Sequence, residues 1–209
     1  MDQVHLRLAE IGLRVAARYG FALAGGYAVQ AHGILDRPSE DVDLFTAWER
    51  RGEFAAAVDA VVDGYRDGGY SVEVTQQFDT FARLTVTDPA QPEHPYKVEL
   101  AANWRALPPV MMDVGPVLHA DDVVAGKMSA LYTRAEPRDF LDIDAALVTG
   151  RYPDAAVRAG RTVRRGVRPA HPGGPVRNAG ALPGPTVRRL RCRPRSHRRD
   201  AQTLRTVAR

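Results

Sequence analysis

The first part of the chain alternates between helical and extended hydrophobic patterns. Residues 3–19 place apolar side chains where a helix with a broad apolar face needs them, and Tyr19-Gly20 marks its end. The short apolar run at 21–24 predicts a strand. Gly25-Gly26 then turns the chain into a second helix that ends near residue 33.

The middle of the chain predicts a strand, a helix and three further strands. In the last three, apolar residues alternate with polar ones, which is the period of a half-buried strand. The Pro-rich stretch at 88–95 predicts a hairpin-like connection, and 111–118 suits either a strand or a loop. The expected segments in order are a loop at 36–40, a strand at 41–46, a helix at 49–67, and strands at 70–76, 80–87 and 96–101.

Two helices follow, one at 121–133 and one from Pro137 to about residue 147. A helix–strand alternation, then a small mixed sheet and then helices predicts an α/β (α+β) fold. We expect one domain with an appendage, in which a core at 1–118 is completed by a helical segment at 119–154.

The charge is segregated along the chain, so the overall net charge of +4 describes neither part. Residues 1–154 carry 14 Lys and Arg against 24 Asp and Glu, a net charge of −10. Residues 155–209 carry 15 Arg and one acid, Asp200, a net charge of +14. The basic character therefore belongs to the tail.

The tail lacks hydrophobic periodicity and is rich in Arg, Pro and Gly. From about residue 156 it is predicted to be disordered or frameshifted, and 155–209 is not expected to form a folded domain. One interpretation is a basic arm that binds nucleic acid. We favour the frameshifted end of a GC-rich gene, because out-of-frame GC-rich codons encode these residues.

Cysteine content and hydropathy indicate the compartment. The single cysteine, Cys192, argues against a disulfide framework. No apolar run reaches membrane-spanning length, and no signal peptide is recognisable at the start. We therefore predict a cytoplasmic protein with no membrane partner.

The stretch GGYAVQAHGILDRPSEDVDLF at 25–45 carries the strongest chemical signal. On a strand, Asp41 and Asp43 point to the same face because side chains alternate with period two. Paired carboxylates bind hard divalent cations such as Mg²⁺. Gly25 and Gly26 would allow phosphate groups to approach the backbone closely. Taken alone, each motif is more often a turn or surface charge, and only the combination indicates a nucleotide site.

This combination resembles the first motif of the nucleotidyltransferase superfamily. The version with Arg37, Ser39, Asp41, Asp43 and Phe45 is similar to the AbiEii/AbiGii-type toxin family, which includes the MenT-like toxins of type IV toxin–antitoxin systems. The strand KVEL at 97–100 and the helical stretch DDVVAGKMSALYTRAEPRDFLDID at 121–144 resemble later motifs in the correct order. The resemblance is expected to cover about residues 5–150.

The resemblance implies a Mg²⁺-dependent enzyme that moves a nucleoside monophosphate from an NTP to a hydroxyl acceptor. The implied partners are an NTP, tRNA or another hydroxyl acceptor, and a cognate antitoxin protein. Asp139 is expected to orient Lys127 or the base, and Arg37 to contact phosphate or pair with Asp41. The implied catalytic residues are Asp41, Asp43, Glu99, Lys127 and Asp139; the nucleotide-binding residues are Gly25, Gly26, Arg37, Ser39, Lys127 and Arg134; and the metal ligands are Asp41, Asp43 and Glu99.

Several of these residues have plainer interpretations. Glu99 could be an edge-strand charge, Lys127 a solvated helix lysine and Ser39 a turn cap. Asp142 and Asp144 could form an acidic helix face.

Three functions remain open: a toxin that modifies tRNA 3′ ends, an aminoglycoside-type nucleotidyltransferase, and an inactive toxin that only binds NTP or antitoxin. An acidic body favours a polycationic drug over RNA.

Overall fold

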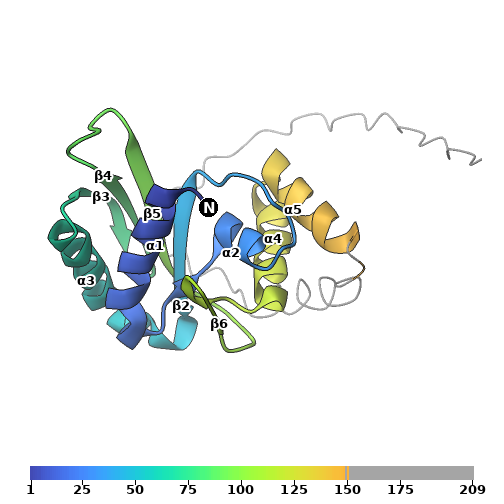
Figure 1. Ribbon diagram of the computed structural model, residues 1–209. Helices are drawn as coiled ribbons and strands as arrows, with labels where there is room; N and C mark the ends of the chain where they lie inside the picture. Colours follow the sequence, from blue (N-terminus) through green and yellow to red (C-terminus); the bar gives the residue numbers. More distant parts are fainter. Residues whose placement is uncertain (149, 151–209) are drawn as a thin grey trace, which may run out of the picture. The chain divides into compact units, whose positions relative to one another are not determined.

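The computed structural model describes residues 1–148 and residue 150 (Figure 1). The predictions for 155–209 lie outside the described residues. Within them the elements are α1 (Gln3–Ala16), η1 (Ala17–Tyr19), β1 (Ala22–Leu23), α2 (Gly25–Ala31), β2 (Asp41–Ala47), η2 (Trp48–Glu53), α3 (Phe54–Asp67), β3 (Ser71–Phe78), β4 (Phe81–Thr87), β5 (Pro95–Asn103), β6 (Val110–Met112), β7 (Gly115–Val117), α4 (Ala120–Thr133) and α5 (Pro137–Val148).

The strands form one mixed sheet in the order β3-β4-β5-β2-β1-β7-β6. Strand β2 pairs in parallel with β5, and β1 in parallel with β7, whereas the other neighbours are antiparallel. Because β2 and β5 are adjacent and parallel, the two strands with predicted acidic residues run side by side. The small mixed sheet flanked by helices and followed by α4 and α5 confirms the predicted fold class.

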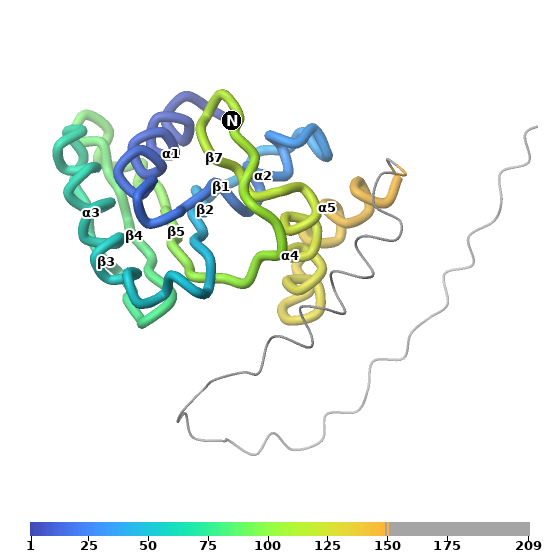
Figure 2. The backbone as a smooth tube through the Cα atoms, turned by 90° about the horizontal axis from the view of Figure 1, so that it is seen from below, coloured from blue at the N-terminus to red at the C-terminus, as the bar shows by residue number. Residues whose placement is uncertain are grey.

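The helices form two groups on either side of β2 (Figures 1 and 2). Helices α1 and α3 pack against each other, and the Tyr65 hydroxyl of α3 donates a hydrogen bond to the Leu8 carbonyl of α1 at 3.0 Å. Helix α2 contacts both β2 and α4, and α4 contacts α5. The second group therefore lies on the face of β2 that is opposite to α1 and α3.

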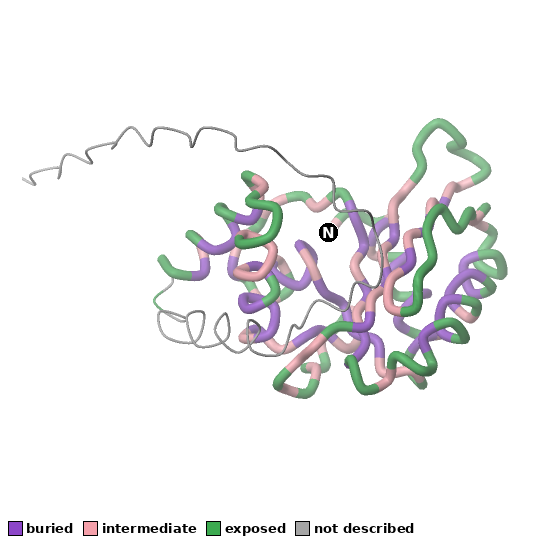
Figure 3. Tube along the Cα trace, turned by 180° about the vertical axis from the view of Figure 1, so that it is seen from behind, coloured by how far each residue is buried: buried purple, intermediate pink, exposed green. Residues whose placement is uncertain are grey.

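A large part of the core lies between the sheet and the helices α1 and α3, and it continues into α2, α4 and α5. Alternate residues of the central strands point into it and are fully buried, among them Val42, Leu44, Leu84, Val98 and Leu100. The intervening residues lie on the opposite face of the sheet, where they are free to carry chemistry. The outer strand β3 is exposed along most of its length (Figure 3).

Three segments differ in detail from the sequence-based expectations. The first α-helix ends at Ala16, and a 3-10 turn leads to Gly20, whose φ of 71° is left-handed. The helix expected from residue 49 is a 3-10 helix until Phe54, because its polar first turn has no apolar side chain to bury. The segment 111–118 contains part of the β6–β7 hairpin. Among the described residues, no helix is long and apolar enough to cross a membrane.

Candidate active site

The register of β2 and β5 brings the predicted carboxylates together. Asp43 lies directly opposite Glu99, and Asp41 lies opposite Lys97. All four side chains are on the face away from α1 and α3, because Val42 alternates with the two aspartates and is fully buried. The alternation read from the sequence therefore placed Asp41 and Asp43 on the correct face.

The glycine pair at the start of α2 is required by close contacts. Gly25 has a left-handed φ of 60°, and a Cβ added there would lie 1.7 Å from Oδ2 of Asp43. A Cβ on Gly26 would lie 2.6 Å from Oγ of Ser39. Any larger residue at these positions would displace groups of the acidic motif. The Tyr27 hydroxyl also donates to the Ser39 carbonyl at 2.8 Å, which fixes the turn before β2.

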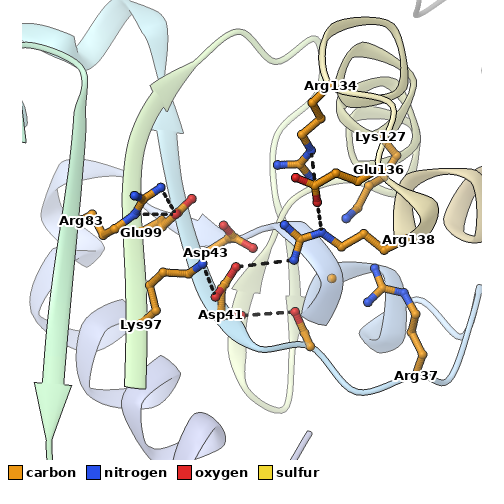
Figure 4. Close-up of a pocket in the computed structure, with 12 residues that line it drawn as sticks. Arg37, Asp41, Asp43, Arg83, Lys97, Glu99, Lys127, Arg134, Glu136 and Arg138 are labelled. Atoms are coloured by element: carbon orange, nitrogen blue, oxygen red, sulfur yellow. Dashed lines mark hydrogen bonds and ion pairs between the residues drawn. The ribbon is translucent and has the colours of Figure 1, made fainter. Parts of the chain in front are cut away.

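These residues line a cavity of about 250 Å³ between the sheet and the helices α4 and α5 (Figure 4). Its wall contains six basic and four acidic side chains, a formal net charge of +2, in a body whose net charge is strongly negative. The lining residues are Gly26, Arg37, Ser39, Asp41, Asp43, Arg83, Lys97, Glu99, Lys127, Arg134, Glu136 and Arg138.

Cations hold two of the carboxylates of the sheet. Lys97 Nζ lies 2.7 Å from Oδ1 of Asp41, and Arg138 Nη1 approaches Oδ2 of the same group at 3.8 Å. Arg83, from β4, donates to Oε1 of Glu99 from Nε at 2.9 Å and lies 2.8 Å from it through Nη2. Figure 4 shows these side chains converging from the two sides of the cavity.

Among the described residues, no Lys, Arg or His side chain lies within ion-pair distance of Asp43, unlike the other carboxylates that line the cavity. Burial first, and then the charges of Glu99 and Asp41, raise the pKa of Asp43 to about 7, against the opposing effects of Lys127 and Lys97. A positive charge added nearby would stabilise the ionised form of Asp43.

Two buried carboxylates of α5 organise the helical side. Asp142, with a fully buried side chain, accepts two hydrogen bonds from Arg37 at 2.7 Å and lies 2.8 Å from Lys127 Nζ. The hydrogen bonds to Asp142 raise the pKa of Arg37. Lys127 itself is only 9% exposed. Asp142 therefore fixes two of the cavity's cations from behind.

Asp139 performs the same task for Arg134. The guanidinium donates to both carboxylate oxygens at 2.9 and 3.0 Å. Burial alone would raise the pKa of Asp139, but the hydrogen bonds and charge of Arg134, and then the charge of Lys127, outweigh it and lower that pKa. Asp139 is completely buried and does not line the cavity.

The structure thus brings together every predicted site residue except Asp139 within or beside one cavity. The ion-pair partner of Lys127 is Asp142, and that of Asp139 is Arg134, although the charge of Lys127 also lowers the pKa of Asp139. Arg37 pairs with Asp142 and not with Asp41, because it reaches across to α5. Gly25 packs closely against Asp43, which lines the cavity.

Sequence reasoning missed several residues that line the cavity or hold it. Lys97 could have been found from alternation, because it lies two residues before Glu99 on β5; Arg83 required the register of β4 against β5, which places it opposite Glu99. Asp142 lies one helical turn after Asp139, and that spacing puts both on one face of α5. Glu136, whose Oε2 lies 2.7 Å from Arg138 Nε, has no sequence signal that distinguishes it from a turn residue.

The donor set fits a divalent cation. Asp41 and Asp43 supply the hard oxygen ligands that Mg²⁺ prefers, and the register places Asp43 directly opposite Glu99. Within residues 1–148 and 150, no three His, Cys, Asp or Glu side chains form a ready-made metal cluster. Asp41 is paired with Lys97, and Glu99 with Arg83.

A second cavity of about 290 Å³ meets the first at Asp43, Glu99, Lys127 and Arg134. Its walls include Phe45, Trp104, Leu118, Val123 and Ala130, so apolar surface is prominent in it. The carboxylates therefore lie between a polar space and a space with apolar walls.

Comparison with protein families identifies the chain. The model of the family "Nucleotidyl transferase AbiEii toxin, Type IV TA system" matches residues 8–201, and the chain belongs to this family. It is therefore a nucleotidyltransferase of a toxin family. The expectation that the resemblance ends near residue 150 is wrong, because the match extends to residue 201. No curated protein sequence matches the chain.

Solved structures with similar folds have low sequence identity. The antibiotic-resistance factor ANT(2'')-Ia is 15% identical, with a TM-score of 0.51 over 79% of this chain and 94% of that one. JHP933 from Helicobacter pylori is 16% identical, with a TM-score of 0.50 over 78% and 81%. MenT4, a nucleotidyltransferase toxin from Mycobacterium tuberculosis H37Rv, is 20% identical, with a TM-score of 0.45 over 65% and 55%.

Proposed function

We propose that this member of the AbiEii nucleotidyl transferase toxin family transfers a nucleoside monophosphate from an NTP to the 3′-terminal hydroxyl of an RNA, with tRNA as the acceptor. The observation that carries the proposal is the composition of the cavity wall. Paired aspartates face a set of six basic side chains, three of which are held in place by the buried acids Asp142 and Asp139.

The basic side chains divide into two groups according to the wall from which they come. Arg37, Lys127, Arg134 and Arg138 come from the helical side and the loop before β2, beside Ser39. This wall suits a triphosphate, since guanidinium and ammonium groups stabilise the charge that grows on the leaving pyrophosphate. Their positions are fixed in advance by carboxylates of α5 and the preceding turn, so little reorganisation is needed when substrate binds.

The sheet side suits the acceptor. Glu99 lies next to Asp43 in the sheet register and is held by Arg83. In the proposed reaction the acceptor oxygen bonds to the α-phosphorus as the bond between that phosphorus and the bridging oxygen of pyrophosphate breaks. Glu99 accepts the proton of the attacking hydroxyl, or helps to hold the cation that makes the hydroxyl more acidic.

Asp41 and Asp43 would hold Mg²⁺, which supplies positive charge at the triphosphate and lowers the pKa of the attacking hydroxyl. Glu99 would be the third ligand. Lys97 and Arg138, which contact Asp41, are side chains with the length and flexibility to move toward substrate phosphates instead.

The charge of the cavity favours an anionic acceptor over a polycationic drug. A formal charge of +2 from the lining residues repels a polyamine and attracts a phosphodiester chain. As a toxin of a type IV system, the protein would act in the cytoplasm, where tRNA and NTPs are available, and its activity would be countered by a cognate antitoxin protein.

The test is to incubate the purified full-length chain with Mg²⁺, total tRNA and each of the four α-labelled NTPs in turn. We expect label on the tRNA 3′ end with one or a few of the nucleotides. Asp41→Asn should abolish it, whereas Asp63→Asn, an exposed acid on α3, should not.

Parallel reactions with aminoglycosides separate the alternatives. Label on an aminoglycoside and none on RNA would refute the acceptor class while retaining the reaction. Absence of transfer to any acceptor, from folded protein that still binds NTP, would indicate an inactive toxin.

A further inference from the structure

The register of four strands defines cross-strand rows on the cavity face of the sheet. One row contains Asp43, Glu99 and Arg83, which are direct neighbours across β2, β5 and β4. Two residues further along, the next row contains Phe45, Ala101 and Phe81, and it continues to Phe78 of β3. We call Phe45, Ala101, Phe81 and Phe78 the aromatic row.

The aromatic row is accessible along its length. Phe78, at the end of β3, is 65% exposed, and Phe81 opposite it is partly exposed. Phe45, at the inner end, is also partly exposed and lines the second cavity beside the carboxylates. The core-facing positions of these strands are filled by aliphatic residues, so the three phenylalanines are not needed for the core. Large apolar side chains that stay accessible together on one face of a sheet therefore call for an explanation.

The row adjoins the reacting groups. Residues two apart on a strand are separated by about 7 Å, so the aromatic row lies about 7 Å from the row of Asp43, Glu99 and Arg83. Arg83 connects the two rows: it holds Glu99, and its guanidinium carbon lies 5.6 Å from the centre of the Phe81 ring. A positive charge is thus placed at the point where the apolar strip meets the carboxylates.

We propose that the aromatic row is a stacking platform for unpaired bases at the 3′ end of an acceptor RNA. The proposal rests on the proposed function, since it assigns the acceptor side of that site. Aromatic rings bind bases of any sequence through their π-faces, while an arginine contacts the backbone phosphates between them. The last base would lie at the inner end of the row, with its ribose hydroxyl toward Glu99, and preceding bases would lie toward Phe78.

An unpaired RNA strand fits this surface better than a duplex or a protein. A duplex hides its bases, so it cannot use exposed rings on an open sheet face. A protein partner that adds a strand to β3 would use the backbone edge of the sheet and would not need rings aligned toward Glu99. Because the aromatic row is aligned with the catalytic carboxylates, its occupant is better explained as the RNA substrate than as a protein partner.

The experiment measures binding of a fluorescent, unpaired RNA oligonucleotide with a free 3′ hydroxyl to the full-length protein. Phe78→Ala should raise the Kd about tenfold, the effect of losing one stacked base. Phe78→Trp should retain wild-type affinity, and Phe78→Leu should resemble Phe78→Ala, because leucine is apolar but has no π-face. Met111→Ala is the matched control, since Met111 is 72% exposed on β6 at the opposite edge of the sheet.

Transfer kinetics provide the second readout. The KM for RNA should rise in Phe78→Ala by the same factor, whereas the KM for NTP should stay unchanged. Unchanged RNA affinity in Phe78→Ala, or full affinity in Phe78→Leu, would overturn the stacking platform. A change in oligomeric state on removal of Phe78 without a change in RNA affinity would assign the row to a protein interface and also overturn it.

These outcomes separate the platform from the proposed function. If the wild type labels RNA but Phe78→Ala has the same KM for RNA, the function stands and the platform fails. If no RNA is labelled although RNA binding depends on an aromatic side chain at position 78, the platform stands and the proposed reaction fails.

Discussion

Asp43→Asn should make the protein more stable at alkaline pH while it abolishes activity. The unfolded carboxyl titrates near 3.8, whereas burial and then the neighbouring acids raise the folded pKa of Asp43 to about 7. Between these values the folded state binds the additional proton. Stability therefore falls as pH rises through this window and levels off above pH 7.

The size of the effect follows from the displacement of the pKa. Three pKa units correspond to about 4 kcal/mol of unfolding free energy in all. About 2–3 kcal/mol of this falls between pH 5 and pH 8. Asparagine has nearly the same shape and no charge, so the stability of Asp43→Asn relative to wild type should increase by this amount over that pH interval.

Urea denaturation at pH 5 and pH 8, in the absence of divalent cations, measures the difference. Asp41→Asn is the control, because Asp41 is paired with Lys97 at 2.7 Å and loses a favourable contact when neutralised. Mg²⁺ should stabilise the wild type more at pH 8 than at pH 5 and should have little effect on Asp43→Asn. An equal stability difference at the two pH values would refute the reasoning, because it would mean that folding does not raise the pKa of Asp43.

Three further predictions follow from the contacts of the site. Gly25→Ala should lower both stability and transfer, because the added Cβ would lie 1.7 Å from the Asp43 carboxylate at a left-handed φ; circular dichroism and labelling measure this. Asp142→Asn should cost about 3 kcal/mol in denaturation and reduce transfer, because it leaves Lys127 and a guanidinium without their buried counter-ion, whereas the exposed Asp144→Asn should do neither. Chelation of divalent cations should stop labelling, and Mg²⁺ should restore it; undiminished transfer in excess chelator would contradict the metal assignment.

Features that follow a strict local periodicity could be predicted from the sequence alone. The alternation of Asp41 and Asp43 with a buried valine placed both acids on one face of β2 without knowledge of any neighbour. The positions of most helices and strands followed in the same way. The β6–β7 hairpin was ambiguous because each of its strands has only three residues, too few to display a period.

Pairing between distant side chains could not be obtained from the sequence. Asp139 and Asp142 lie on one face of α5, and nothing local says which cation each would bind. The structure pairs Asp142 with Arg37, which is 105 residues away. The direction of α5 relative to α4 decides this pairing, and the turn between them contains Ala135 with a left-handed φ of 52°, which alanine seldom adopts.

The net charge of the body was a misleading guide to its substrate. Outside the first cavity, the described residues carry seven Lys and Arg against nineteen Asp and Glu, whereas the cavity wall carries six basic and four acidic side chains. Over the described residues an RNA meets mostly negative charge, and the cavity wall carries the opposite sign. This distribution of charge repels the body of a folded RNA. A single-stranded end can still bind, because it can enter the cavity without bringing many phosphates close to the acidic exterior. For binding through the described residues, the same distribution predicts a weak dependence of RNA affinity on salt, since few phosphates would be neutralised in the complex.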